Sequence, residues 1–185
     1  PPNFRLRSWW TLVFLFIWLQ PDAQPCTSPD VQDLYTQLYK SVDANNAVGA
    51  LMIYDSLQTR LGDESLEDCR LKLWILYERG EALELLSQFK DALDIYYDLV
   101  QDAERLKEWE VAAETYISIA RTFEMIRRPE NCLRYLKEAI ALIEEHELPA
   151  VYSRYAVRYS SYHRQFDNLD SALIYSRIAY AYGKK

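Results

Sequence analysis

The sequence predicts an all-α fold, a solenoid of about four antiparallel helix pairs. The first observation is a set of small residues at a fixed interval: Ala92, Cys132 and Ala172 are each 40 residues apart, and a weaker copy, Ala50, lies 42 residues before Ala92. The second is that the 185 residues contain only 4 glycines and 7 prolines. A β-rich chain needs many turns, so this scarcity favours helices. Because a repeat decides the fold before any local pattern does, the interval has the greater weight.

A matching position lies twelve residues before each small residue, where the first helix of each pair is expected. The four residues at this position are Leu38, Gly80, Ala120 and Ser160, and all but Leu38 are small. Paired helices approach to about 8–10 Å, and small side chains at the contact let the backbones come together. One helix pair cannot bury its apolar face alone, so neighbouring pairs must stack.

The apolar periodicity sets the expected helix boundaries. The four pairs are expected at residues 30–43 and 46–61, 65–87 and 89–106, 108–126 and 129–146, and 148–165 and 168–182. Ser28 before Pro29 is typical of an N-cap followed by a first-turn proline. The acidic residues at 63–68 are expected in the first turn of the third helix, where they favour the helix dipole.

The helix pairs form one expected domain over residues 30–185, with repeats at 30–62, 65–106, 108–146 and 148–183. No polar capping helix follows the fourth pair, and stacks need a solubilising end. We therefore expect a fifth repeat or a further domain beyond Lys185.

The N-terminal residues resemble a targeting segment. Arg5 and Arg7 precede an apolar run at residues 9–19, which ends at a polar, proline-containing stretch. This order predicts a secretory signal peptide over residues 1–23 and a linker over 24–29, and so an exported protein, periplasmic or membrane-associated in a bacterium. Two alternatives stay open: a lipoprotein anchored at Cys26, and an aromatic-rich helix packed on the first repeat.

Composition limits the chemistry. The formal charge is −7 and the pI is near 4.9, which argues against nucleic acid as a partner because that requires a basic surface. Three widely separated cysteines predict neither a disulfide framework nor a zinc site, and Cys69 and Cys132 are expected to be small core residues on helices. No catalytic, phosphate-binding or metal-binding motif is present, so the sequence predicts no metal, no cofactor and no enzyme activity.

The order of small and aromatic residues resembles a known family. A small residue in the first helix, then Phe89, Ala92 and Tyr96, is similar to the tetratricopeptide repeat (TPR) over about residues 30–183. The resemblance implies a right-handed solenoid. The period of 40 rather than 34 residues implies longer helices, and HEAT-like repeats of that length are the alternative. The phrase at residues 170–176 resembles exported TPR regions of Bacteroidetes-type signalling proteins.

The resemblance also implies a concave groove, lined by the first helix of each pair. Transferring the family's groove positions gives Tyr35, Tyr39, Trp74, Tyr77, Glu81, Arg121, Arg154, Arg158 and Arg164, together with Glu84, Glu114 and Glu124. The implied partner is a protein or peptide, including one with an acidic segment that arginine can bind bidentately. A membrane is expected to be contacted only through the N-terminal segment or a region beyond Lys185.

Three functional hypotheses follow. The first is a non-catalytic scaffold for protein–protein interaction. The second is a sensory or assembly segment of a larger membrane-anchored signalling protein, such as a histidine kinase or a transcriptional regulator. The third is an enzyme with its site in the groove, which a cavity with clustered, perturbed carboxyl groups would favour.

Overall fold

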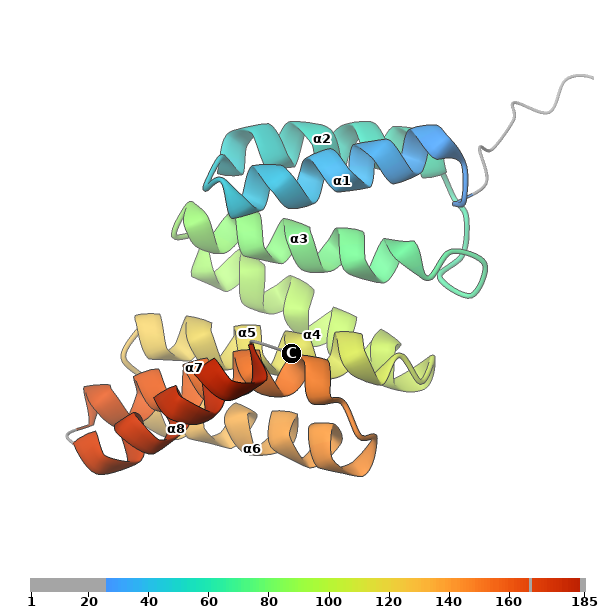
Figure 1. Ribbon diagram of the computed structural model, residues 1–185. Coiled ribbons are helices and arrows are strands. Elements are labelled where there is room, and N and C mark those ends of the chain that lie inside the picture. Colours follow the sequence, from blue (N-terminus) through green and yellow to red (C-terminus); the bar gives the residue numbers. More distant parts are fainter. Residues whose placement is uncertain (1–25, 167, 184–185) are drawn as a thin grey trace, which may run out of the picture.

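A computed structural model describes residues 26–166 and 168–183 (Figure 1). The signal peptide expected at residues 1–23 lies outside these residues, as does the start of the linker. Within the described residues the chain forms eight helices: α1 (Pro29–Asp43), α2 (Ala47–Leu61), α3 (Leu71–Leu85), α4 (Phe89–Arg105), α5 (Trp109–Met125), α6 (Pro129–Glu145), α7 (Pro149–Gln165) and α8 (Leu169–Tyr182). None of the described helices has both the length and the apolar character needed to cross a bilayer.

The helices pack as four sequential antiparallel pairs, which confirms the predicted all-α solenoid (Figure 1). We call α1, α3, α5 and α7 the A helices and their partners the B helices. Successive A helices contact one another, at α1·α3, α3·α5 and α5·α7. Among the described residues, no B helix contacts another B helix. The A helices therefore lie on the tighter, inner side of the stack, and the B helices spread apart on the outside.

Helix length explains the 40-residue period. Helices α5 and α6 have 17 residues each, and three-residue turns follow them. The middle residue of these turns adopts a left-handed backbone although it is not glycine, as at Ser87, Lys107, Arg127 and Glu147, with φ of 51–60°. Backbone N–H groups in these turns close back onto the preceding helix, for example Gln88 to Leu83 at 2.9 Å. This repeated turn reverses the chain without glycine, which is why four glycines suffice.

The predicted start of the third helix is wrong. Helix α3 begins at Leu71 rather than at residue 65, and the acidic residues before it form a loop. Gly62 enters this loop with a φ of 52°, and the Ser65 hydroxyl both accepts from the Asp68 N–H at 3.2 Å and donates to its carboxylate at 2.7 Å. These local hydrogen bonds compete with helix formation, so the acidic stretch stabilises a turn. The cap predicted at Ser28 is confirmed, since its Oγ accepts from the Val31 N–H.

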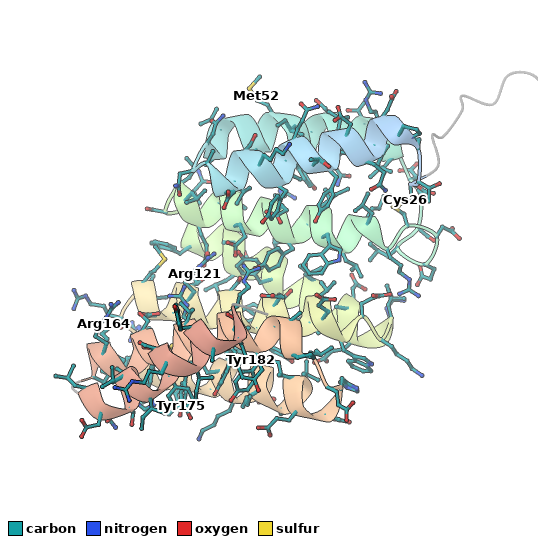
Figure 2. All side chains as sticks on the ribbon, viewed as in Figure 1. Cys26, Met52, Arg121, Arg164, Tyr175 and Tyr182 are labelled. Carbon is teal, nitrogen blue, oxygen red and sulfur yellow. A yellow bond between two sulfur atoms is a disulfide. The ribbon has the colours of Figure 1, made fainter. Side chains whose placement is uncertain are left out.

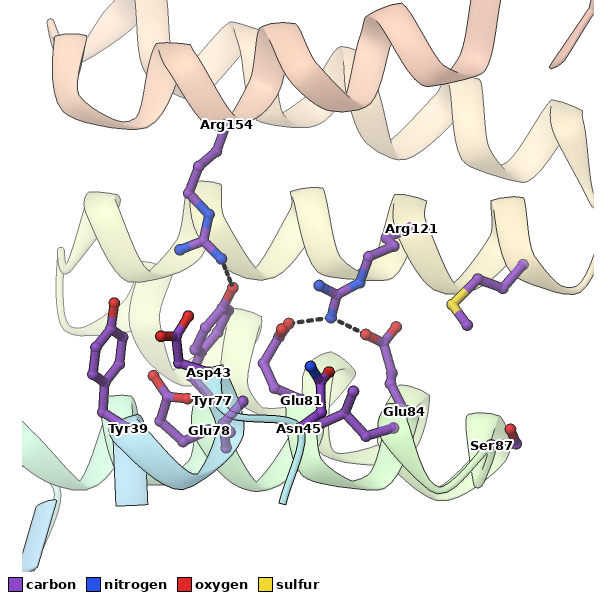
Figure 3. A pocket seen from close by; sticks show the side chains of 13 residues that line it. Tyr39, Asp43, Asn45, Tyr77, Glu78, Glu81, Glu84, Ser87, Arg121 and Arg154 are labelled. Atoms are coloured by element: carbon purple, nitrogen blue, oxygen red, sulfur yellow. Dashed lines mark hydrogen bonds and ion pairs between the residues drawn. The ribbon is translucent and has the colours of Figure 1, made fainter. Parts of the chain in front are cut away.

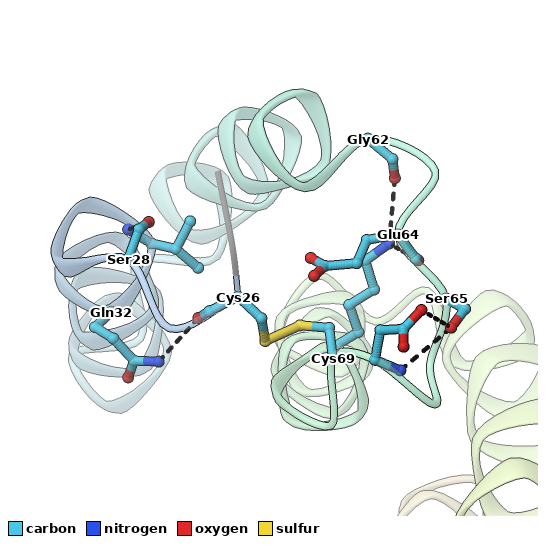
Figure 4. Close-up of a disulfide and its surroundings, with 10 residues drawn as sticks. Cys26, Ser28, Gln32, Gly62, Glu64, Ser65 and Cys69 are labelled. Carbon is cyan, nitrogen blue, oxygen red and sulfur yellow. Dashed lines mark hydrogen bonds between the residues drawn. A yellow bond between two sulfur atoms is a disulfide. The ribbon is translucent and has the colours of Figure 1, made fainter. Parts of the chain in front are cut away.

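The cysteine prediction is wrong in part. Cys26 and Cys69 form a disulfide across a sequence separation of 43 residues, with their Cα atoms 5.4 Å apart (Figure 4). Cys69 lies in the loop before α3 rather than on a helix. Stacking brings the start of α1 beside the start of α3, a proximity that spacing along the sequence does not reveal. Cys132 is a free, fully buried residue of α6, as predicted.

The helices of the second pair meet at Gly80. A Cβ atom placed on Gly80 would lie 2.3 Å from Cε1 of Tyr96, which is itself fully buried. One repeat later the equivalent pair is Ala120 and Leu136, both fully buried. The two helices of a pair therefore approach closely, as the repeat predicts. The space left by the missing side chain of Gly80 is filled by the large Tyr96 side chain of the partner helix.

Gly80→Ala is expected to lower the free energy of unfolding by about 1–3 kcal/mol, because the added methyl overlaps the Tyr96 ring. Gly80→Ala with Tyr96→Leu recreates the pair found one repeat later, so the alanine is expected to cost much less in that background. Urea denaturation of the two single variants and the double variant measures this coupling. Equal costs in both backgrounds would contradict the packing argument.

Reduction of the disulfide is expected to destabilise the chain by about 2–4 kcal/mol, because it frees a long loop in the unfolded state. Denaturation with and without dithiothreitol measures the difference. A variant with both Cys26→Ser and Cys69→Ser is the control and should not respond to the reductant. An unchanged midpoint for the parent chain would show that the bond contributes nothing to stability.

Candidate functional site: a charged groove on the A helices

The inner face of the stack contains two adjoining cavities. The first has a volume of about 670 Å³ and is lined from α1, α3, α5 and α7 by residues that include Tyr39, Asp43, Glu78, Glu84 and Met125 (Figure 3). We call it the acidic cavity, because its lining holds four carboxyl groups and two guanidinium groups. The second, which we call the basic hollow, has a volume of about 460 Å³ and is lined by residues of α5, α7 and the turn after α5, including Arg127, Arg158 and Arg164. Arg121 and Met125 line both, so the two cavities form one groove.

Arg121 is the centre of an ion-pair network between α3 and α5. Its guanidinium donates to the carboxylates of Glu81 and Glu84, which are both buried (Figure 3). Ser118 also donates to Glu81, at 2.7 Å, and Thr122 donates to Glu84. Burial alone would raise the pKa of Glu81, but Arg121 and the hydrogen bonds outweigh it and lower that pKa. At Glu84 burial outweighs Arg121, and the pKa is raised.

Arg154 extends the network to α7. Its Nη2 donates to the Tyr77 hydroxyl at 2.9 Å, and its Nε lies 3.2 Å from Oε2 of Glu114. That oxygen is buried and has no aligned hydrogen bond, so the contact is an ion pair without full hydrogen-bond geometry. Burial raises the pKa of Glu114 to about 7 despite Arg154. The Tyr77 hydroxyl also lies 3.0 Å from the Ser118 hydroxyl, which connects α3, α5 and α7.

Glu78 is a groove residue that the sequence analysis missed. Its side chain lines the acidic cavity and is only 5% exposed, yet no hydrogen bond or ion pair within 4.0 Å joins it to the described residues. Burial and the charge of Glu81 raise its pKa to about 7, while Arg154 and Arg121 lower it and Asp43 raises it. Its position three residues before Glu81 places both on one helix face, a signal that could have found it.

The basic hollow has its own internal pairing. Arg158 donates to Glu124 at 2.8 Å, and the Ser161 hydroxyl donates to the other oxygen of that carboxylate. Arg127 and Arg164 are exposed, and no ion pair is formed by either among the described residues. Among the described residues, the groove's positive charge without an ion-pair partner therefore lies in the turn after α5 and near the end of α7.

The structure brings together seven of the nine groove residues chosen from the sequence. Tyr39, Tyr77, Glu81, Arg121 and Arg154 line the acidic cavity, and Arg158 and Arg164 line the basic hollow with Arg121. Tyr35 and Trp74 line neither cavity; both are half-buried, and Trp74 packs edge-on against Tyr77 with ring centroids 5.7 Å apart. As contacts of a partner, all nine stay predictions. No group of three or more histidine, cysteine, aspartate or glutamate side chains in the described residues could hold a metal ion.

Glu78→Gln is expected to stabilise the chain more at pH 8 than at pH 5, by about 2 kcal/mol. A carboxyl group whose pKa is raised in the folded state costs stability progressively as pH rises from its ordinary pKa of 4.5 to its folded pKa of about 7, and glutamine removes that cost. Urea denaturation at both pH values checks it, with the same substitution at exposed Glu145 as the control. An equal gain at both pH values would contradict the buried-charge interpretation.

Comparison with known proteins supports the fold. No family model and no curated protein sequence matches the chain. The crystal structure of aspartyl phosphate phosphatase F from Bacillus subtilis is similar to it, with a TM-score of 0.71 and 17% sequence identity. The match covers 84% of this chain and 40% of that protein. At this identity the likeness shows the fold, and the chain is an all-α, TPR-like stack of antiparallel helix pairs.

Proposed function

We propose that the chain is a non-catalytic scaffold that binds a protein or peptide partner along the groove of its A helices. The observation that supports this is one continuous groove, built from two adjoining cavities, to which all four A helices contribute. An extended partner lying across the stack can contact every repeat, as in other solenoids that use a concave face.

The groove is stiffened before any partner arrives. The hydrogen bonds and ion pairs of Arg121 and Arg154 join side chains of α3, α5 and α7. A surface that is already ordered loses less conformational entropy on binding, so more of the contact energy appears as affinity. Exposed Tyr39 and the arginines are of the residue types that dominate binding hot spots.

The pairing of the arginines decides where an acidic segment of a partner would bind. Arg121 and Arg154 are already neutralised by carboxylates of this chain. We therefore assign that role to the basic hollow, where Arg127 and Arg164 are exposed. Bidentate pairing of a carboxylate with arginine suits this position.

The enzyme hypothesis rests on clustered carboxyl groups with raised pKa values. Burial raises the pKa of Glu78 and of Glu114 to about 7 and also raises the pKa of Glu84. Glu78 and Glu84 line the cavity, but the carboxylate of Glu84 is already bound by Arg121 and Thr122. Glu114 instead faces Arg154. General acid–base catalysis needs groups that reach one reacting centre, so a binding role is the better supported proposal.

The disulfide supports the proposal of export, because such bonds persist in oxidising compartments such as the periplasm. The alternative proposal is that the chain is the sensory or assembly segment of a larger membrane-anchored signalling protein. In both proposals the partner binds in the same groove, and they differ in whether the solenoid is attached to a signalling domain.

A pulldown from periplasmic extract tests the groove. We expect the 185-residue chain to retain a partner that a variant with Tyr39→Ala and Arg164→Glu loses, with affinity reduced at least about tenfold, because both side chains are exposed in the groove. Isothermal titration calorimetry with the identified partner measures the loss.

The matched control carries Met52→Ala on the B helix α2 (Figure 2) and Arg177→Glu on the B helix α8, and both residues are exposed. Circular dichroism should show equal helicity for all three proteins. Loss of the partner from the control and its retention by the groove variant would move the binding surface to the outer face and overturn the proposal.

A further inference from the structure

The acidic cavity has more negative than positive charge to satisfy. Its four lining carboxyl groups belong to Asp43, Glu78, Glu81 and Glu84. Arg121 is shared between the last two, and Arg154 is held by Glu114 from outside the lining. The remaining carboxyl groups, of Asp43 and Glu78, have no cation within ion-pair distance among the described residues.

Glu78 is the carboxyl group at which this charge imbalance matters most. It is 95% removed from solvent, since only 5% of it is exposed, and Figure 3 shows its carboxyl group directed into the cavity with no partner drawn to it. A largely buried carboxylate without an ion-pair partner is unfavourable, because it loses most of its hydration without compensation. A cation that enters the cavity would supply the missing partner.

The chemistry of the cavity favours an organic cation over a metal ion. No three acidic, histidine or cysteine side chains of the described residues converge at metal-binding distances. The cavity is instead broad, about 670 Å³, and has tyrosines in its wall. Tyr39 is 53% exposed, so its ring is accessible to a cation that stacks on it.

We infer that the acidic cavity is a specificity subsite for a lysine or arginine side chain of the bound peptide, with Glu78 as its counter-ion and Asp43 and Tyr39 at its rim. This assignment rests on the proposed function, since it names the chemistry of one position in the partner. Glu78 is a binding residue in it and takes part in no reaction.

The neighbouring basic hollow determines the orientation in which a peptide binds. A basic side chain is repelled by Arg127 and Arg164 and attracted by Glu78 and Asp43. A peptide with a basic side chain and an acidic group on either side of Arg121 therefore binds in one orientation only. Electrostatic complementarity of this kind sets register and excludes wrong partners.

A positional library of acetylated hexapeptides tests the inference. Each position carries arginine, lysine, citrulline or norleucine in turn, and citrulline matches arginine in shape without its charge. Fluorescence polarisation at pH 8 is measured on the 185-residue chain. We expect one position at which arginine binds at least about tenfold more tightly than citrulline.

Glu78→Gln is expected to reduce that arginine preference to near one and to leave the affinity for the citrulline peptide unchanged. Asp55→Asn, on the exposed face of α2, is the matched control and should keep the preference. Peptides that bind without any preference for arginine would overturn the subsite and leave groove binding intact. A preference that survives in Glu78→Gln would overturn the role of Glu78. Failure of every peptide to bind would overturn both the subsite and peptide binding by the groove.

Discussion

Close packing of successive A helices is the constraint on which the rest of the structure depends. Among the described helices, the A helices contact one another along the stack, whereas the B helices contact A helices alone. One side of the stack is therefore shorter than the other, and the groove lies on the short side. Within a pair, the A and B helices approach closely at small residues, as Gly80 of α3 does against Tyr96 of α4. A larger side chain there would separate the backbones of α3 and α4.

Charged groups on a close-packed face must be paired, because burial removes their hydration. Arg121 and Arg154 meet this requirement by joining Glu81, Glu84, Glu114 and Tyr77 across three A helices. The same contacts hold the helices in register and fix the shape of the groove. Glu78 is the exception on this face: it is as buried as those carboxylates, yet no ion pair or hydrogen bond joins it to the other described residues.

Among the described residues, the first helix pair packs on one neighbour, α3, whereas the middle pairs pack on both sides. Helices α1 and α2 both contact α3, and the disulfide from Cys26 to Cys69 adds a covalent link at the same junction. Lys72 of α3 also stabilises this junction, because its ammonium group donates to the backbone carbonyls of Gly62 and Glu64 in the loop between α2 and α3 (Figure 4). The first pair is thus held to α3 by a disulfide and by hydrogen bonds as well as by apolar contact.

The sequence by itself determined the repeat, the helix pairs and most helix ends, because a small residue every 40 positions and helical periodicity are local signals. It also placed most of the groove residues, through positions inherited from a resemblance. Only the tertiary structure decided which charges neutralise one another: Arg121 and Arg154 pair with carboxylates 37 to 40 residues away, and Glu78 pairs with no cation of the described residues. It also decided the disulfide, since stacking alone brings Cys26 to Cys69. Pairing depends on distances across helices, and no local pattern in one chain encodes those distances.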